Sequence, residues 1–341
     1  MKNRPIPKNC SFISGNARRQ TFCGKATLIR FAPYFLTLLL FASFAALGAT
    51  PASALELHQT PKNMNTTFDL DKETINEEDL TIRSKDGAAS YFLTFSGGQA
   101  GDTGGRYLTD GTHSLHYGIY DGVNSRTLLK DIDDNPSSDE VLSGSLEDRG
   151  NNWTEAIESF AVILEYDQFP PAGQYTDDFT ITLYKGNAED ISSAEKIEEA
   201  KVKLRVKVES VLDISLVPRG SSFDETKTDL TLDFGVLSAG SERSGDIMVR
   251  SNDTYSLTLN SENGGVMENF YEEDTSTVPY TLSVNGSELN LSSDTETTVA
   301  ANDGPTPVTG ERYTLNVRIG DFGMATEGEY QDIISVTVTA P

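Results

Sequence analysis

The chain has 341 residues, of which 52 are acidic and 27 are basic, so its formal charge is −25. A chain this acidic repels nucleic acid and anionic lipid, and both are excluded as expected partners. Its length fits two ordinary domains.

Residues 1–54 read as a leader that is removed on export. They hold seven basic residues and no acidic one, then an apolar run over 31–49 and the small-x-small sequence Ala52-Ser53-Ala54. This pattern predicts a signal peptide cleaved before Leu55, and therefore a protein exported to the periplasm and cell surface, away from the membrane after cleavage. An uncleaved membrane anchor is the alternative, because the apolar run is long enough for a short span.

Removal of the leader changes the composition of the remaining chain. The formal charge goes from −25 to −32, and both cysteines, Cys10 and Cys23, are lost. The exported part therefore has no thiol, no disulfide and no cysteine-based metal site.

Beyond Leu55 the apolar residues alternate in short runs separated by Gly, Asn, Asp and Ser. This spacing is typical of all-β domains. One helix is predicted, over 192–200, because Ser192 to Glu195 reads as a capping box.

The two halves of the chain repeat each other in order. In the first half and the second half respectively, "SYFLTFSGG" corresponds to "TYSLTLNSENGG", "SLHYGIYDGV" to "TVPYTLSVNGS", and "SFAVILEY" to "RYTLNVRIG". We therefore predict two tandem immunoglobulin-like β-sandwiches, over 55–208 and 209–341.

Each half also contains G-x-Y-x-D joined to a strand. The glycine permits a turn, the tyrosine can place its hydroxyl on backbone, and the aspartate can cap the amides of the turn. A lone Tyr and Asp could instead belong to a sugar site, but recurrence in both halves favours a structural role. The residues are Gly173, Tyr175, Asp177, Gly328, Tyr330 and Asp332.

The two copies differ in the segment on the C-terminal side of this element. After the first copy comes "KVKLRVKV", whose apolar residues Val202, Leu204, Val206 and Val208 alternate with basic ones. We predict that it closes the first sandwich as its last strand, with a solvated basic face that also discourages edge pairing. After the second copy the sequence ends in a strand carrying Ile334, Val336 and Val338.

The second sandwich is therefore expected to lack its last strand. The edge at Ile334, Val336 and Val338 would take a strand from another polypeptide. A segment of the same chain lying in that place would contradict this expectation.

Several stretches resemble one family: "SNDTYSLTLNSENGG", "LTLDFGVLSAG", "EGEYQDIISVTVTA" and, in the first copy, "GRYLTDGTHSLHYGIYDG". They are similar to the spore-coat-protein-U-like domain of secreted pilus subunits assembled by archaic chaperone–usher systems. The resemblance implies donor-strand complementation, with a periplasmic chaperone, an outer-membrane usher and another pilus subunit as partners. The sequence departs from the family in two ways. The disulfide that subunits of this family often hold is absent, and the first copy lacks the sequence Leu-Asp-Phe-Gly that the second copy has at 232–235.

The function implied by this resemblance is that of a structural subunit of a surface fimbria. The segment 55–70 is a poor donor strand, which favours the fibre tip and adhesion to a host or abiotic surface. The alternative is a freestanding secreted carbohydrate-binding or surface-layer protein whose second sheet closes by itself.

No catalytic, metal or cofactor site is predicted. His113 and His116 point to opposite faces of a strand, and the acidic loop 131–140 has Pro136 and Leu142 where a calcium-binding EF-hand needs Gly and Glu. A solvated loop is favoured there over a calcium site. Aromatic residues that could bind a surface, or cap the sandwich instead, are Trp153, Tyr166 and Phe169.

Overall fold

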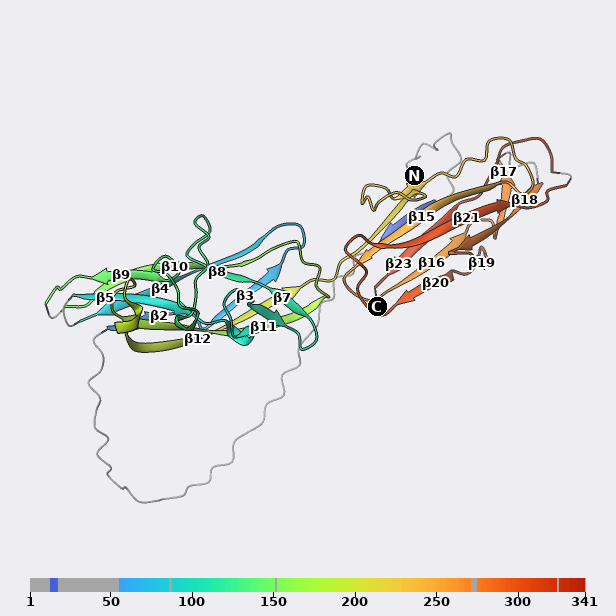
Figure 1. Cartoon of the computed structure of the whole chain (residues 1–341). Coiled ribbons are helices and arrows are strands. Elements are labelled where there is room, and N and C mark those ends of the chain that lie inside the picture. The colour runs from blue at the N-terminus through green and yellow to red at the C-terminus, as the bar shows by residue number, and fades with distance from the viewer. Residues whose placement is uncertain are drawn as a thin grey trace, which may run out of the picture.

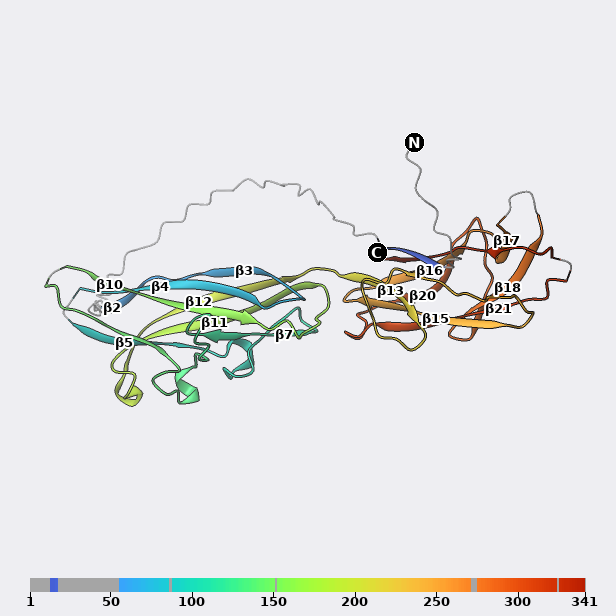
Figure 2. The same cartoon turned by 90° about the horizontal axis from the view of Figure 1, so that it is seen from above.

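The computed structural model describes residues 13–17, 55–85, 88–150, 152–270, 275–323 and 325–340. These residues form strands, three short 3-10 helices and connecting loops, so the predicted all-β fold is confirmed. Two sandwiches lie end to end (Figures 1 and 2). The apolar run of the leader lies outside the described residues. Within them, no helix has the length and hydropathy needed to cross a membrane.

The first sandwich is built from two sheets in the orders β2-β4-β10-β8 and β3-β12-β11-β5-β9. Two further short strands, β6 and β7, pair with each other beside β11. The strands are β2 (Leu55–Gln59), β3 (Asn63–Phe68), β4 (Thr74–Ser84), β5 (Ala89–Phe95), β6 (Tyr107–Thr109), β7 (Ser114–His116), β8 (Gly118–Tyr120), β9 (Leu142–Leu146), β10 (Thr154–Leu164), β11 (Gly173–Lys185) and β12 (Glu195–Val208).

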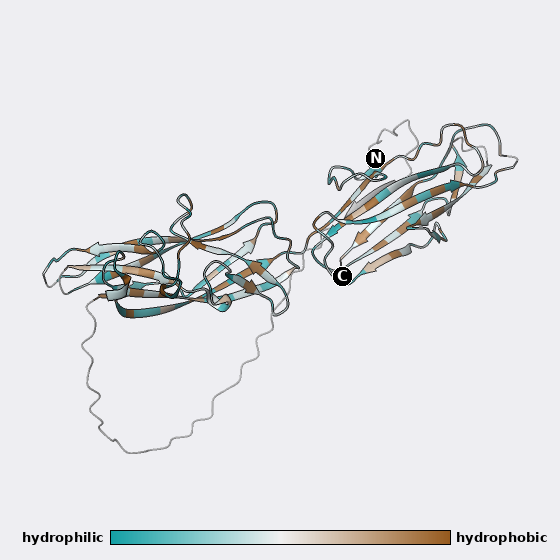
Figure 3. Cartoon of the chain, in the orientation of Figure 1, coloured by the Kyte–Doolittle hydropathy of each residue, from teal (hydrophilic) through white to brown (hydrophobic). Residues whose placement is uncertain are grey.

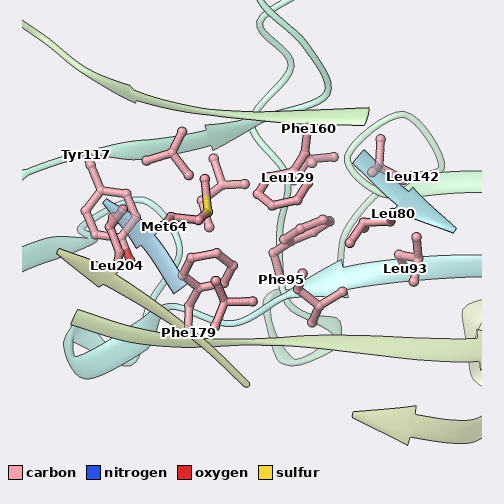
Figure 4. Close-up of a cluster of buried hydrophobic side chains, with 14 of the residues drawn as sticks. Met64, Leu80, Leu93, Phe95, Tyr117, Leu129, Leu142, Phe160, Phe179 and Leu204 are labelled. Atoms are coloured by element: carbon pink, nitrogen blue, oxygen red, sulfur yellow. The ribbon is translucent and has the colours of Figure 1, made fainter. Parts of the chain in front are cut away.

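The core of the first sandwich lies between these sheets. Phe160 packs against Phe95 with ring centroids 5.2 Å apart and against Phe179 at 6.3 Å. Figure 4 shows these rings beside Met64 and Leu204, which come from opposite ends of the domain's sequence. All five side chains are almost completely buried. Strands from the beginning and the end of this half therefore close one core.

The second sandwich has one sheet in the order β13-β15-β21-β18-β17-β22, with β19 beside β18, and another in the order β14-β1-β23-β16-β20. The strands are β1 (Ile13–Ala17), β13 (Leu212–Pro218), β14 (Asp229–Leu230), β15 (Glu242–Ser251), β16 (Tyr255–Ser261), β17 (Val266–Asn269), β18 (Thr277–Val284), β19 (Ser287–Leu289), β20 (Thr297–Asn302), β21 (Glu311–Ile319), β22 (Tyr330–Gln331) and β23 (Ile334–Thr339).

The two sandwiches have the same strand plan. The order β2-β4-β10-β8 in the first corresponds to β13-β15-β21-β18 in the second, and β3-β12-β11-β5-β9 corresponds to β14-β1-β23-β16-β20. The repeated sequence blocks fall on corresponding strands, with β5 matching β16, β10 matching β21 and β11 matching β23. Figure 3 shows the alternation of apolar and polar residues along these strands.

The prediction of a helix over 192–200 is wrong. A short 3-10 helix occupies Ile191–Ser193, and the chain then enters β12 at Glu195. The reason is tertiary: β11 is 13 residues long, and its far end pairs with the beginning of β12, where Lys185 lies opposite Glu195. Strand pairing supplies more hydrogen bonds than one capping box.

Candidate strand-acceptor site

In the first sandwich, β12 fills the place between β3 and β11. It runs antiparallel to β11, with Val206 opposite Tyr175, and parallel to β3, with Val208 opposite Phe68. Its four apolar residues, Val202, Leu204, Val206 and Val208, are 0–2% exposed. Burial of each such side chain is worth about 1.5–3 kcal/mol. The first sandwich thus contains its own last strand.

In the second sandwich, the corresponding place lies between β14 and β23. Three apolar residues of β23, Ile334, Val336 and Val338, are 0–1% exposed and face the core. This place, which we call the acceptor slot, is occupied by β1. The expectation that no segment of the chain would lie there therefore does not hold for the full-length chain. The segment comes from residues predicted to belong to the leader.

The occupant of the acceptor slot runs in the opposite direction to β12. It is parallel to β23 and antiparallel to β14, whereas β12 is antiparallel to β11 and parallel to β3. The positions in register with Ile334, Val336 and Val338 hold Ile13, Gly15 and Ala17. Since glycine and alanine offer little apolar surface, this sequence is poorly matched to an apolar site.

The acceptor slot continues into a cavity of about 480 Å³ beyond the beginning of β1. Residue 13 pairs with both Leu230 and Ile334, and the cavity lies between the segments that follow Leu230 and precede Ile334. Its apolar lining includes Leu232, Phe234, Met267, Val278, Phe322 and Ala325. The slot is therefore longer than the strand that occupies it.

The tyrosines of the G-x-Y-x-D elements make the same contact in both sandwiches. The Tyr175 hydroxyl donates to the carbonyl of Pro171 at 2.9 Å, and the Tyr330 hydroxyl donates to that of Thr326 at 2.7 Å. Each bond reaches four residues back along the chain. Burial raises the pKa of Tyr175 to about 12, so this hydroxyl stays protonated and remains a donor.

The aspartates of the G-x-Y-x-D elements accept hydrogen bonds from backbone amides in the same way in both sandwiches. Asp177 accepts from the amides of Gln99 at 3.1 Å and Asp178 at 2.8 Å. Asp332 accepts from those of Asn263 at 3.1 Å and Ile333 at 2.8 Å. Both carboxylates are buried, 4% and 1% exposed. The first three predicted turn residues therefore lie within the first part of β11, and the other three lie just before β23.

Sequence reasoning missed the hydroxyl partners of these aspartates. Tyr117 donates to Asp177 at 2.7 Å, and Tyr280 donates to Asp332. Burial raises the pKa of Tyr117 and of Tyr280, with the neighbouring carboxylate adding to the shift. The alignment of "SLHY" with "TVPY" already placed these two tyrosines at matching positions, which was the signal available.

A second repeated pair links the sheets near the core. Tyr91 donates to Glu158 at 2.6 Å, and Tyr255 donates to Glu311 at 2.9 Å. Arg106 has no buried arginine as a counterpart in the described part of the second sandwich: it is 1% exposed and donates to the backbone carbonyls of Phe95, Ser96, Thr103 and Leu129. Burial lowers its pKa to about 10, still well above neutrality.

The acidic loop 131–140 is organised by its own contacts. The Lys130 ammonium lies 2.5 Å from a Glu140 carboxylate oxygen, and this bond holds the pKa of Glu140 down at about 2. Thr103 donates its hydroxyl to Asp134. Among the residues that the structure describes, no group of three or more His, Cys, Asp or Glu side chains could hold a metal ion.

The predicted binding aromatics do not come together. Trp153 precedes β10 and Tyr166 and Phe169 follow it, so a strand of 11 residues, about 36 Å, separates them. Trp153 is 41% exposed, and the central carbon of the Arg83 guanidinium lies over its ring, 4.2 Å from the centroid of the Trp153 ring. Phe169 is next to the junction with the second sandwich, where Ala172 donates its amide to the carbonyl of Asn252 at 2.9 Å.

Comparison with known proteins agrees with the sequence resemblance. Residues 72–182 match the family model of the Spore Coat Protein U domain, so the resemblance is confirmed over that range, about a third of the chain. The range begins just before β4 and ends within β11. A search of curated proteins gives no match.

Solved structures with similar folds include three from fimbrial systems. A chain of the CsuC–CsuE chaperone–tip adhesion subunit complex of Acinetobacter baumannii is 14% identical, with 84% of this chain and 99% of that chain covered and a TM-score of 0.38. The CfaE adhesin of enterotoxigenic E. coli is 11% identical, with 83% of this chain and 99% of that chain covered and a TM-score of 0.35. The CupB6 tip adhesin of Pseudomonas aeruginosa is 10% identical, with 83% of this chain and 97% of that chain covered and a TM-score of 0.30. At these values the matches carry no argument about function.

Proposed function

We propose that this protein is an exported structural subunit of a surface fimbria, whose second sandwich accepts a strand from another polypeptide. One observation carries the proposal: the place that β12 fills in the first sandwich is filled in the second only by β1, a segment of the predicted leader. Cleavage before Leu55 would leave Ile334, Val336 and Val338 along an open edge. Leaving these three apolar side chains uncovered, at about 1.5–3 kcal/mol each, would cost a large part of the usual 5–15 kcal/mol of domain stability.

The partners are inferred from this open edge and from the Spore Coat Protein U match. A periplasmic chaperone would fill the acceptor slot first, and a neighbouring pilus subunit would replace it during export through an outer-membrane usher. Strand addition of this kind gains affinity from main-chain hydrogen bonds and register from alternate side chains. No catalytic activity is expected.

A place at the fibre tip is supported by the segment after the predicted cleavage point. Residues 55–59 and 63–68 form β2 and β3, and Leu55, Met64 and Phe68 are 1–4% exposed in the first core. They are therefore committed to the first sandwich and are not free to act as a donor. Immunogold labelling should find this subunit once, at the end of each fibre, and labelling along the shaft would contradict the tip placement.

The strand-acceptor role can be tested by thermal unfolding of the exported protein, after mass spectrometry of its N-terminus. A peptide with alternating Val or Ile residues should raise the melting temperature of the second sandwich. Val336→Asp, which puts a charge on the core face, should abolish the shift, and Thr337→Asp, on the outer face, should not. No shift with any such peptide would rule out the role.

The freestanding alternative is favoured by a different result of the same measurement. If the exported protein retains residues 13–17, β1 can close the second sheet within the chain, as it does in the structure. The protein would then be a self-contained two-domain surface protein, and added peptides would not change its melting temperature.

A further inference from the structure

The outer face of β12 carries one row of basic side chains. Lys201, Lys203, Arg205 and Lys207 alternate along the strand with the buried residues that close the first core. Lys201 and Lys207 are exposed, and Lys203 and Arg205 are half-buried. Since successive residues on one face of a strand are about 6.6 Å apart, this basic row extends over about 20 Å.

Three of the four residues in the basic row lie away from a sheet edge. β11 pairs with β12 along its whole length, and β3 pairs with its other side over residues 203–208, so Lys203, Arg205 and Lys207 lie between two strands. The sequence-based explanation that basic residues here discourage edge pairing therefore does not apply to Lys203, Arg205 and Lys207, because that role requires an unpaired strand, and it stays a prediction for Lys201 alone.

The charges of the basic row are only partly balanced. Lys203 lies 4.0 Å from Asp178, and Lys207 lies 2.6 Å from Glu209. Neither Lys201 nor Arg205 has an ion-pair partner among the described residues, although Arg205 donates to the side-chain oxygen of Asn63 at 2.9 Å. Like charges that follow one another on the same face of a strand repel each other. In a chain with 52 acidic residues, such an unbalanced row indicates a role beyond folding.

The neighbours of the basic row are mostly amides and hydroxyls. Opposite it on β11 lie Gln174, Thr176, Asp178 and Thr180, and on β3 lie Asn63, Asn65 and Thr67. Apart from Asp178, these groups are uncharged and can both donate and accept hydrogen bonds. None of the large apolar side chains exposed within the described part of the chain lies on β3, β11 or β12, which argues against a lipid surface.

We propose that the outer face of β3, β12 and β11 binds a linear anionic polysaccharide. Carboxylates of the sugar chain would pair with the basic row, and sugar hydroxyls would bond to Asn65, Thr176 and their neighbours. A polyuronate suits the site because it carries separated charges and many hydroxyls, whereas nucleic acid has a much denser charge that the net −25 of the chain repels. This binding goes beyond fibre assembly, which does not use this face.

The test is calorimetric titration of the full chain with polygalacturonate oligomers. Replacement of Lys203, Arg205 and Lys207 by Gln should weaken binding about tenfold or more, since each exposed ion pair contributes modestly. The matched control replaces Lys72, Lys85 and Lys227 by Gln, which are exposed and lie outside β3, β11 and β12. It changes the net charge equally and should leave affinity unchanged. Affinity for the unaltered chain should also fall as salt rises.

Three outcomes would overturn the proposal. They are equal weakening in both variants, binding to neutral dextran as tight as to polygalacturonate, and tighter binding to a DNA oligonucleotide. Circular dichroism melts of both variants show whether the fold is retained. The assay involves no strand exchange, and it can be repeated with a peptide filling the acceptor slot, so its failure would leave the proposed fimbrial role untouched.

Discussion

Asn252 of the second sandwich donates its side-chain amide to the carbonyl of Pro170 in the first, at 3.2 Å. The same side-chain amide donates to the backbone carbonyl of Glu209 at 2.9 Å, and the side-chain oxygen of Asn252 accepts from the backbone amide of Val211 at 2.8 Å. The residue is 0% exposed. One side chain therefore joins the loop between β10 and β11 of the first sandwich, the linker and the start of the second sandwich.

Asn252→Ala should loosen this junction. It removes three hydrogen bonds and leaves buried groups without partners, which costs about 1–3 kcal/mol per unsatisfied group. Small-angle scattering of the variant should show a broader distribution of distances between the two sandwiches. Asn290→Ala, at an exposed position, is the control. An unchanged distribution in Asn252→Ala would mean that other contacts hold the junction.

Tyr175→Phe and Tyr330→Phe should each weaken only their own sandwich. Each substitution keeps the ring and removes the bond from the hydroxyl to the carbonyl four residues back, at a cost of about 1 kcal/mol. Hydrogen exchange followed by mass spectrometry can measure the two sandwiches separately. Faster exchange in both sandwiches after one substitution would contradict independent turns.

Asp177→Ala should be much more destabilising than Asp177→Asn. Alanine leaves the Tyr117 hydroxyl and the amides of Gln99 and Asp178 without their acceptor, at about 1–3 kcal/mol for each group that stays unpaired. Asparagine can still accept from the amides, while the Tyr117 hydroxyl can rotate to accept from its amide group. Urea unfolding at neutral pH gives the comparison, and equal losses would contradict it.

The pH dependence of Asp177→Asn has a definite sign. Burial raises the pKa of Asp177 above the ordinary 3.8, so the folded state holds this proton more tightly than the unfolded state. Its contribution to stability is present below pH 3.8 and is lost as the pH rises through the raised pKa. Relative to the unaltered protein, Asp177→Asn should therefore gain stability as the pH rises through that range. A constant difference between pH 3 and 7 would show that the raised pKa is absent.

The internal repeat explains how much of the fold was accessible from sequence. Alternating Val202, Leu204, Val206 and Val208 predicted a closing strand because a strand of period two must bury one face, and all four are buried. The 192–200 segment was misread because its pairing with β11, where Lys196 lies opposite Tyr184, depends on a partner distant in sequence. The direction of β1 and its place in the acceptor slot could not be predicted from the sequence either, because residues 13–17 carry no strong strand pattern.

The same limit applies to the repeated hydrogen bonds. Tyr117 and Asp177 are 60 residues apart, and only the fold brings their oxygens to 2.7 Å. Arg106 is harder still, because a buried arginine bound by carbonyls has no sequence signature. Local turn chemistry such as the bond from Tyr175 to Pro171 was predictable, since both partners lie within four residues.

Leu204→Ala should destabilise the first sandwich alone. Leu204 is 0% exposed and lies in the core beside Met64, with which it also pairs in register across β3. Truncation of a buried leucine costs about 2–5 kcal/mol, because it loses apolar contact and leaves a cavity. Thr176→Ala, on the outer face of the neighbouring strand, should change stability by less than about 0.5 kcal/mol. Because β12 belongs to the same chain, the loss should not depend on protein concentration or on any added peptide. Rescue of Leu204→Ala by an alternating peptide would show that β12 leaves its place and that the first sandwich, too, can exchange a strand.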